Sequence, residues 1–238
     1  MPGAWESGEI DIVFRPEHRL VDNEITGLTA LLRWTHPEQG VIEHERCVEL
    51  AETTGLMLPL GTWLLRGAAE RIRWWQEAGG GDLPLSVGLT ASQATDQDLV
   101  GNVLRVLGDT GLSAGSLRLG LPSGLLVADH DDAVDNLTVL ADAGVRTAMD
   151  GFTGSVGEFA CLEVLPVREV WIPRWEVCGE RNPITTRVLG DLVAVAHLAG
   201  AVVVVDGVDT GELAEWWRGA GADVGVGAYF GEPAGLGE

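Results

Sequence analysis

Short apolar runs alternate with longer amphipathic segments along most of this 238-residue chain. Each run has the length and aliphatic composition of a buried strand, and the segments between the runs repeat apolar residues at helical spacing. The clearest helix is expected over residues 60–77, where Leu64, Ala68, Ile72 and Trp75 share one face. Further helices are expected over 96–110, 131–143, 185–199 and 211–220. The expected strands are 10–14, 27–34, 85–89, 117–121, 145–149, 169–172, 201–206 and 224–228.

This alternation predicts an α/β protein, and eight strands in a chain of this length favour a closed barrel over an open sheet. The first two strands are an exception, because residues 15–26 contain too few residues for a helical crossover. These strands are therefore expected to pair as an antiparallel hairpin. The length of the chain fits one domain over residues 1–238.

The chain carries a formal net charge of −21, from 36 acidic and 15 basic residues. Such a surface repels phosphate backbones, so the composition excludes binding of DNA or RNA through a basic face. All the basic residues counted are arginines, and the sequence contains no lysine. This absence excludes a Schiff base, a phosphate-loop lysine and a lysine that activates a nucleophilic water.

No apolar stretch approaches the roughly 18 residues that a membrane helix needs, so no contact with a membrane is expected. The first residues, MPGAWESGEIDIVF, lack the basic start and apolar core of a signal peptide. The cysteines, Cys47, Cys161 and Cys178, form no CxxC pair, and the histidines lack metal-ligand spacing. These features predict a reduced, cytoplasmic protein without a disulfide or zinc framework.

Seven segments together resemble one protein family in their order and spacing. They read LTALLRWTHPEQGVI, LAETTGLMLPLGTWLL, LSVGLTASQ, GVRTAMDGFTG, LPVREVWIPR, VVVDGVDT and GAYFGEP, and they resemble EAL domains over residues 9–233. The resemblance implies a modified TIM (β/α)8 barrel whose first strand is antiparallel. It also implies hydrolysis of cyclic di-GMP by two divalent cations, held by acids and an asparagine at the strand ends.

At the family's metal-binding and catalytic positions this chain departs from the pattern. The signature glutamate is replaced by Thr29, a metal-binding asparagine by Gly88, and the lysine by Trp171, whose indole is expected in the barrel mouth. The full set of positions is Thr29, Gly88, Gly120, Asp150, Gly151, Trp171, Pro173, Asp206, Asp209 and Val226. With three acids left, we expect no metal, no cofactor and no catalytic residue, so the chain is predicted not to be an enzyme.

Two arginines are candidates for ligand binding. Arg33 matches the family arginine that reaches the phosphate of the dinucleotide, and Arg15 stands where the family has a glutamine. For Arg33 the alternative is an ion pair with a nearby acid, and for Arg15 it is a surface or salt-bridge role. Asp206 and Asp209 are read either as relic acids that cap the following helix or as ligands of a single metal ion.

The resemblance and these substitutions predict a catalytically inactive, regulatory protein-interaction module in cyclic di-GMP signalling, with an unidentified protein partner. A non-hydrolytic receptor for cyclic di-GMP and a hydrolase with altered metal use are the alternatives. Homodimerisation beside the loop DGFTGSVGEF stays open. Exposed indoles are expected among Trp74, Trp216 and Trp217, either as a docking patch or as packing at the seam of helices and barrel.

Overall fold

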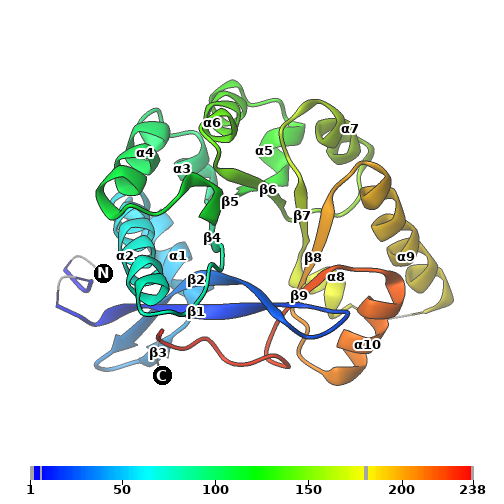
Figure 1. Ribbon diagram of the computed structural model, residues 1–238, viewed down its shortest axis with the longest axis horizontal. Helices are drawn as coiled ribbons and strands as arrows, with labels where there is room; N and C mark the ends of the chain where they lie inside the picture. The colour runs from blue at the N-terminus through cyan, green and yellow to red at the C-terminus, as the bar shows by residue number, and fades with distance from the viewer. Residues whose placement is uncertain (1–2, 6, 180–181, 237–238) are drawn as a thin grey trace.

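The computed structural model describes residues 3–5, 7–179 and 182–236. Within these residues, eight strands form a closed barrel with helices around it (Figure 1). The strands are β1 (Ile10–Arg19), β2 (Ile25–His36), β4 (Leu85–Gly88), β5 (Leu117–Pro122), β6 (Arg146–Asp150), β7 (Glu169–Ile172), β8 (Val202–Asp206) and β9 (Val224–Val226). Their order around the barrel is β1-β9-β8-β7-β6-β5-β4-β2, and pairing of β1 with β2 closes the circle. A short strand, β3 (Gly40–Ile42), pairs with β2 outside the circle.

The first strand runs against its neighbours. β1 is antiparallel to both β2 and β9, whereas the pairs from β2 through β4 to β9 are parallel. Only residues 20–24 separate β1 from β2, too few for a crossover helix. The structure thus confirms the α/β barrel and its antiparallel first strand.

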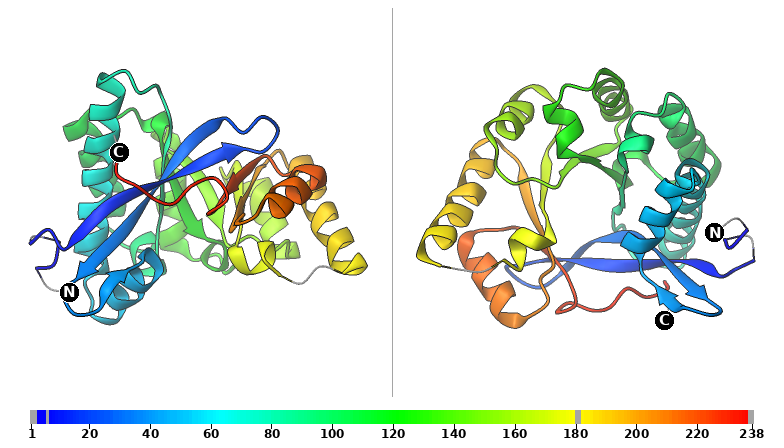
Figure 2. Two further views of the ribbon diagram at one scale, coloured as in Figure 1. Left: turned by 90° about the horizontal axis from the view of Figure 1, so that it is seen from below. Right: turned by 180° about the vertical axis from the view of Figure 1, so that it is seen from behind.

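The helices surround the strands (Figure 2). They are α1 (His44–Thr53), α2 (Met57–Glu77), α3 (Ala91–Ala94), α4 (Leu99–Thr110), η1 (Ala114–Ser116), α5 (Ser123–Val127), α6 (Asp131–Asp142), α7 (Val156–Val164), α8 (Arg174–Val177), α9 (Pro183–Leu198) and α10 (Gly211–Ala220). The predicted face of α2 is confirmed, because Leu64, Ala68 and Ile72 are buried and Trp75 is half-buried. Gly111 ends α4 in the left-handed conformation, which glycine adopts without steric cost.

The tryptophans divide between surface and core. The side chain of Trp74 is 61% exposed, and Trp217 is fully buried with Trp216 packed partly buried beside it. Among these three residues, Trp74 therefore has the exposed indole. Trp216 and Trp217 on α10 instead pack between the helix and the barrel.

The C-terminal segment lies along β1 (Figure 2). The backbone N–H of Phe14 donates to the carbonyl of Ala234 at 2.8 Å, and Ala234 N–H donates back at 3.0 Å. In the described part of the chain, no helix has both the length and the apolarity that a bilayer crossing requires.

Candidate functional site

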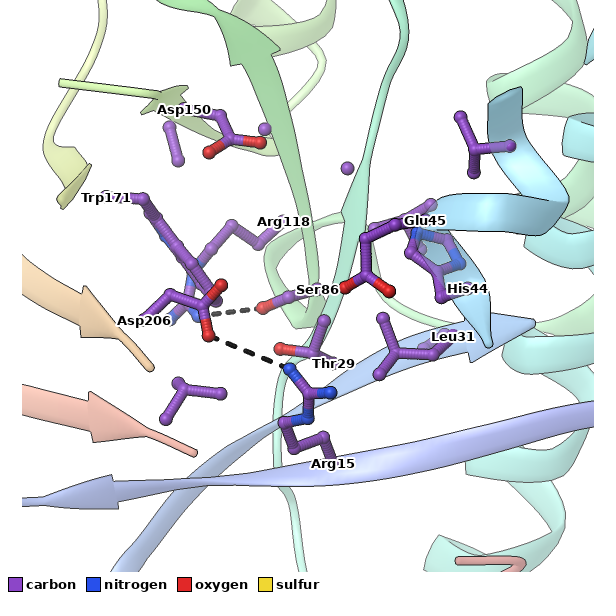
Figure 3. A pocket seen from close by; sticks show the side chains of 17 residues that line it. Arg15, Thr29, Leu31, His44, Glu45, Ser86, Arg118, Asp150, Trp171 and Asp206 are labelled. Carbon is purple, nitrogen blue, oxygen red and sulfur yellow. Dashed lines mark hydrogen bonds and ion pairs between the residues drawn. The ribbon is translucent and has the colours of Figure 1, made fainter. Parts of the chain in front are cut away.

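A cavity of about 380 Å³ opens inside the barrel, at the ends of β4, β6, β8 and β9 (Figure 3). The last residues of these strands, Gly88, Asp150, Asp206 and Val226, all line it. The carboxyl end of the strands is where barrels of this kind build their sites, because the loops there are free to vary. The cavity brings together seven of the ten family positions: Thr29, Gly88, Gly120, Asp150, Trp171, Asp206 and Val226.

Three family positions lie outside the lining. The Gly151 carbonyl accepts a hydrogen bond from the Ser123 hydroxyl at 3.0 Å, and Pro173 is the N-cap residue of α8. Asp209 accepts from the backbone N–H of Ala228 at 3.1 Å and forms an ion pair with Arg174. Asp209 therefore links the segments after β7 and β9 at the mouth of the barrel.

Thr210, and neither of the two acids Asp206 and Asp209, caps helix α10. The hydroxyl of Thr210 accepts from the backbone N–H of Leu213 at 3.2 Å. Neither Asp206 nor Asp209 makes this contact, so the expectation that they cap the helix is wrong.

Two carboxylates share the upper part of the cavity. Burial raises the pKa of Asp150, and the negative charge of Asp206 raises it further. Burial also raises the pKa of Asp206, against the lowering effect of the Arg15 and Arg174 guanidinium groups. Arg15 Nη1 lies 3.7 Å from Asp206 Oδ1, close enough for attraction and too far for a hydrogen bond. The two acids are thus incompletely compensated.

A buried ionic network forms the floor of the cavity. Arg118 donates to Glu17 Oε2 at 2.6 Å and to Ser86 Oγ at 2.8 Å, and its Nε lies 3.0 Å from Glu169 Oε1. Burial raises the pKa of Glu169 to about 7, although Arg118 opposes this shift. Burial alone would lower the pKa of Arg118, but Glu17 and Glu169 raise it overall. Two carboxylates therefore compete for one guanidinium.

The same network orients two lining residues. The Thr29 hydroxyl donates to Glu17 Oε1 at 2.9 Å, and the Trp171 indole N–H donates to Glu169 Oε1 at 2.6 Å. Trp171 stands in the barrel as the resemblance implies, yet the indole leaves the cavity open beside it (Figure 3). Both side chains are held by buried acids, so neither is free to turn.

The sequence analysis missed the residues of this floor, although a signal for them existed. Ser86, Arg118 and Glu169 each stand two residues before Gly88, Gly120 and Trp171 on the same strands, and alternation places such residues on the same face. A charged residue at an inward position of a barrel strand indicates a buried partner across the barrel.

Helix α1, which the sequence analysis did not predict, adds Glu45 and His44 to the lining. Nδ1 of His44 accepts from the backbone N–H of Leu32 at 3.1 Å. Burial lowers the pKa of His44 to about 4, so the ring is neutral near pH 7 with its proton on Nε2.

The two candidate arginines are placed differently. Arg15 lines the cavity, whereas the guanidinium of Arg33 donates to the carbonyl of Pro233 at 2.6 Å. Arg33 lies on the same face of β2 as Thr29 and Leu31, further along the strand, where it holds the C-terminal segment.

The oxygen donors do not fit the pair of divalent cations that the resemblance implies. Within residues 3–5, 7–179 and 182–236, no three histidine, cysteine, aspartate or glutamate side chains are grouped so that they could hold a metal ion. Gly88 and Gly120 offer no side-chain donor, and the hydroxyl of Thr29 is committed to Glu17. No reaction step through a metal follows from this geometry.

Known proteins are similar to this chain in sequence and in fold. MucR of Pseudomonas aeruginosa, a bifunctional diguanylate cyclase/cyclic di-GMP phosphodiesterase, is 28% identical over 97% of this chain and 34% of its own length. NbdA of the same organism, a cyclic di-GMP phosphodiesterase, is 28% identical over 97% of this chain and 30% of its own length. The chain spans between 27% and 54% of the length of the first curated relatives. A solved PaMucR phosphodiesterase in complex with c-di-GMP superposes with a TM-score of 0.92 and 27% identity, over 99% of this chain and 96% of that chain.

These relatives correct one prediction. The expectation that the chain is not an enzyme is contradicted, because proteins similar along nearly its whole length are named as phosphodiesterases. Substitutions at motif positions do not by themselves show that activity is absent. The EAL domain model matches residues 1–233, and the chain belongs to the EAL domain family of cyclic di-GMP signalling proteins.

Proposed function

We propose that this chain binds cyclic di-GMP at the barrel mouth and acts as a ligand-responsive regulatory domain. One observation carries the proposal: seven positions that serve ligand and catalysis in the family converge on one cavity that stays open. The similarity to a phosphodiesterase solved with c-di-GMP supports it.

Arg15 is the group best placed to meet a phosphate. Its side chain is 20% exposed at the cavity, and it forms no hydrogen bond with Asp206 at 3.7 Å. Arg118, the other arginine in the lining, is held by Glu17, Ser86 and Glu169. A phosphodiester would therefore attract Arg15 away from Asp206 at little cost.

The acids at the mouth work against a dianionic ligand. Asp150, Asp206 and Glu45 all line the cavity, and like charges at short range weaken binding. Binding should therefore depend strongly on Arg15, which is the feature that a mutation can test.

Calorimetric titration of the protein with cyclic di-GMP tests the proposal. We expect a dissociation constant of about 10 μM or below, and at least about tenfold weaker binding by Arg15→Ala. Arg46→Ala is the matched control, because Arg46 pairs with Glu49 on α1 and does not line the cavity. Chromatography of the same samples follows conversion to the linear product, so turnover is measured beside binding. Failure of the wild-type protein to bind at about 1 mM ligand would overturn the proposal.

A second candidate function is association with another copy of the chain. Helix α9 presents Ile184, Val188, Val195 and Leu198, which are 75%, 59%, 42% and 87% exposed, along its length. A groove between α7 and α9 is lined by Phe159 and Leu162 together with the last part of this stripe. Asp191, which pairs with Arg187, interrupts the stripe between Val188 and Val195. Exposed apolar side chains gathered along one helix face are nevertheless typical of interaction sites.

We propose that this stripe packs against the same stripe of a second copy. Light scattering of the eluting protein should give the mass of a dimer, and Ile184→Asp with Leu198→Asp should give a monomer. Val21→Asp, at a position that is 74% exposed on the β1–β2 hairpin, should leave the mass unchanged. A wild-type monomer at about 100 μM would contradict dimerisation.

A further inference from the structure

Trp171 gives the cavity a fixed aromatic wall. Its indole N–H is committed to Glu169 Oε1 at 2.6 Å, and that carboxylate lies 3.0 Å from Arg118 Nε. The ring plane is therefore locked, while the indole still lines the open space (Figure 3). A locked, half-buried aromatic face is suited to stacking on a flat ring.

Small residues line the back of the cavity next to this wall. A Cβ atom on Gly88 would meet nothing closer than Asp150 Oδ2 at 3.9 Å, and one on Gly120 nothing closer than Asp150 Cβ at 3.7 Å. Neither glycine has a positive φ, so the backbone does not require glycine at either position. With Ala148 beside them, they leave space that larger side chains would fill.

An acceptor without a donor borders the same space. Asp206 Oδ1 is shielded from solvent and has no hydrogen-bond partner. The nearest cation, Arg15 Nη1, is 3.7 Å away. A buried acceptor without a donor is costly, and the Asp206 side chain as a whole is 33% exposed and lines the cavity, so its carboxylate is suited to receive hydrogen bonds from a ligand.

We propose that the cavity takes one guanine base of the dinucleotide, stacked on Trp171, over Gly88 and Gly120, with its edge donating to Asp206. This inference rests on the proposed function and adds the subsite and its base selectivity. About 380 Å³ is near the lower end of small-molecule pockets, so a single base fits while the phosphates and the second base stay at the rim beside Arg15.

The selectivity follows from the edge of the base. Guanine presents two adjacent donors, N1–H and the N2 amino group, which match a carboxylate. Adenine presents an acceptor at N1 next to its amino group, and this acceptor would face Asp206. A site built around a buried polar group discriminates strongly against a ligand that leaves the group unpaired.

Calorimetric titrations with cyclic di-GMP and cyclic di-AMP test the subsite. The wild-type protein should prefer cyclic di-GMP by about 100-fold or more, and Asp206→Asn should reduce this preference to below about tenfold. Gly120→Val should weaken cyclic di-GMP binding by at least about tenfold by filling the space, although the backbone accepts a side chain there.

Trp171→Phe and Trp171→Ala separate stacking from folding. The phenylalanine variant keeps a ring and should bind cyclic di-GMP within about fivefold of wild type, whereas the alanine variant should lose at least about tenfold. Trp74→Ala, on the exposed face of α2, is the control and should bind normally. Ligand-induced quenching of tryptophan fluorescence should be present in the wild-type protein and in Trp74→Ala, and smaller in Trp171→Phe.

The outcomes distinguish the two proposals. If the wild-type protein binds cyclic di-GMP but the Trp171 and Gly120 variants bind it equally well, or if cyclic di-AMP binds as tightly, the guanine subsite is refuted while binding at the mouth stands. If the wild-type protein binds no cyclic di-GMP, both proposals fall.

Discussion

Trp171 and Glu169 lie two residues apart on one face of β7, and the indole of the first donates to the carboxylate of the second at 2.6 Å. This contact joins the cavity wall to the ionic floor, because Glu169 is also the partner of Arg118. The protonation of one buried acid thus bears on the position of the aromatic ring.

The first prediction concerns pH and stability. Burial raises the folded-state pKa of Glu169 from 4.5 to about 7, so between these values the folded protein holds a proton that the unfolded chain has released. The contribution of Glu169 to the free energy of unfolding should therefore fall as pH rises from about 4.5 to about 7, and then level off. Urea unfolding at several pH values should show this fall in wild type and a smaller one in Glu169→Gln. Identical slopes in the two proteins would contradict the assignment.

The second prediction concerns the floor itself. Arg118→Met leaves Glu17 and Glu169 buried without their cation, and breaking a buried ion pair in this way costs about 3–5 kcal/mol. Urea unfolding should show that the free energy of unfolding of Arg118→Met is lower than that of wild type by this amount. Adding Glu17→Gln and Glu169→Gln should recover part of it, because the uncompensated charges are then removed. A loss below about 1 kcal/mol would mean that the guanidinium contributes little.

The third prediction concerns the affinity for cyclic di-GMP. Burial and the negative charge of Asp206 raise the pKa of Asp150, so this acid takes up a proton at higher pH than a free carboxyl group does. That proton removes a negative charge beside a dianion while the Asp206 carboxylate stays available to the base, and binding should therefore tighten as pH falls toward the range in which Asp150 takes up its proton. Asp150→Asn should bind a few-fold more tightly at about pH 7 and respond less to pH. Affinity that weakens on acidification would run against this electrostatic account.

The fourth prediction separates the two arginines. Because Arg33 holds the carbonyl of Pro233, Arg33→Ala should lower the free energy of unfolding by about 1 kcal/mol through the lost hydrogen bond. Its effect on cyclic di-GMP binding should stay within about threefold, against at least about tenfold for Arg15→Ala. Unfolding curves and titrations of both variants check this, and equal losses of affinity would place Arg33 in the ligand site.

Much of the fold could be predicted from local pattern. The eight strands are short apolar runs, and the brevity of the link between the first two specifies their antiparallel pairing. Helix α7 escaped prediction because its sequence, VGEFACLEV, is largely apolar and lacks a clear polar face, although Ser155 and Glu158 form a capping box at its start. Helix α1 was missed for the opposite reason, since Cys47 and Ala51 are its only buried residues.

The site was predictable only in part. The family positions at the last residue of a strand do line the cavity. They could be predicted because the carboxyl ends of the barrel strands meet at one face, so the place of a strand end in the sequence gives its place in the barrel. The floor was not predictable from local pattern, since Glu17 and Arg118 are 101 residues apart and meet only when the barrel closes. The prediction that the chain is not an enzyme failed because it counted substituted motif positions, and such a count does not measure activity.

The floor has a consequence for how the barrel opens. Glu17, Ser86, Arg118 and Glu169 come from β1, β4, β5 and β7, so a single guanidinium ties together strands from different sides of the barrel. If β1, β5 or β7 separates from the rest, a charge of Glu17, Arg118 or Glu169 is left without its partner. Their amide protons should exchange with deuterium as one cooperative group, while the amides of α9 exchange earlier and independently.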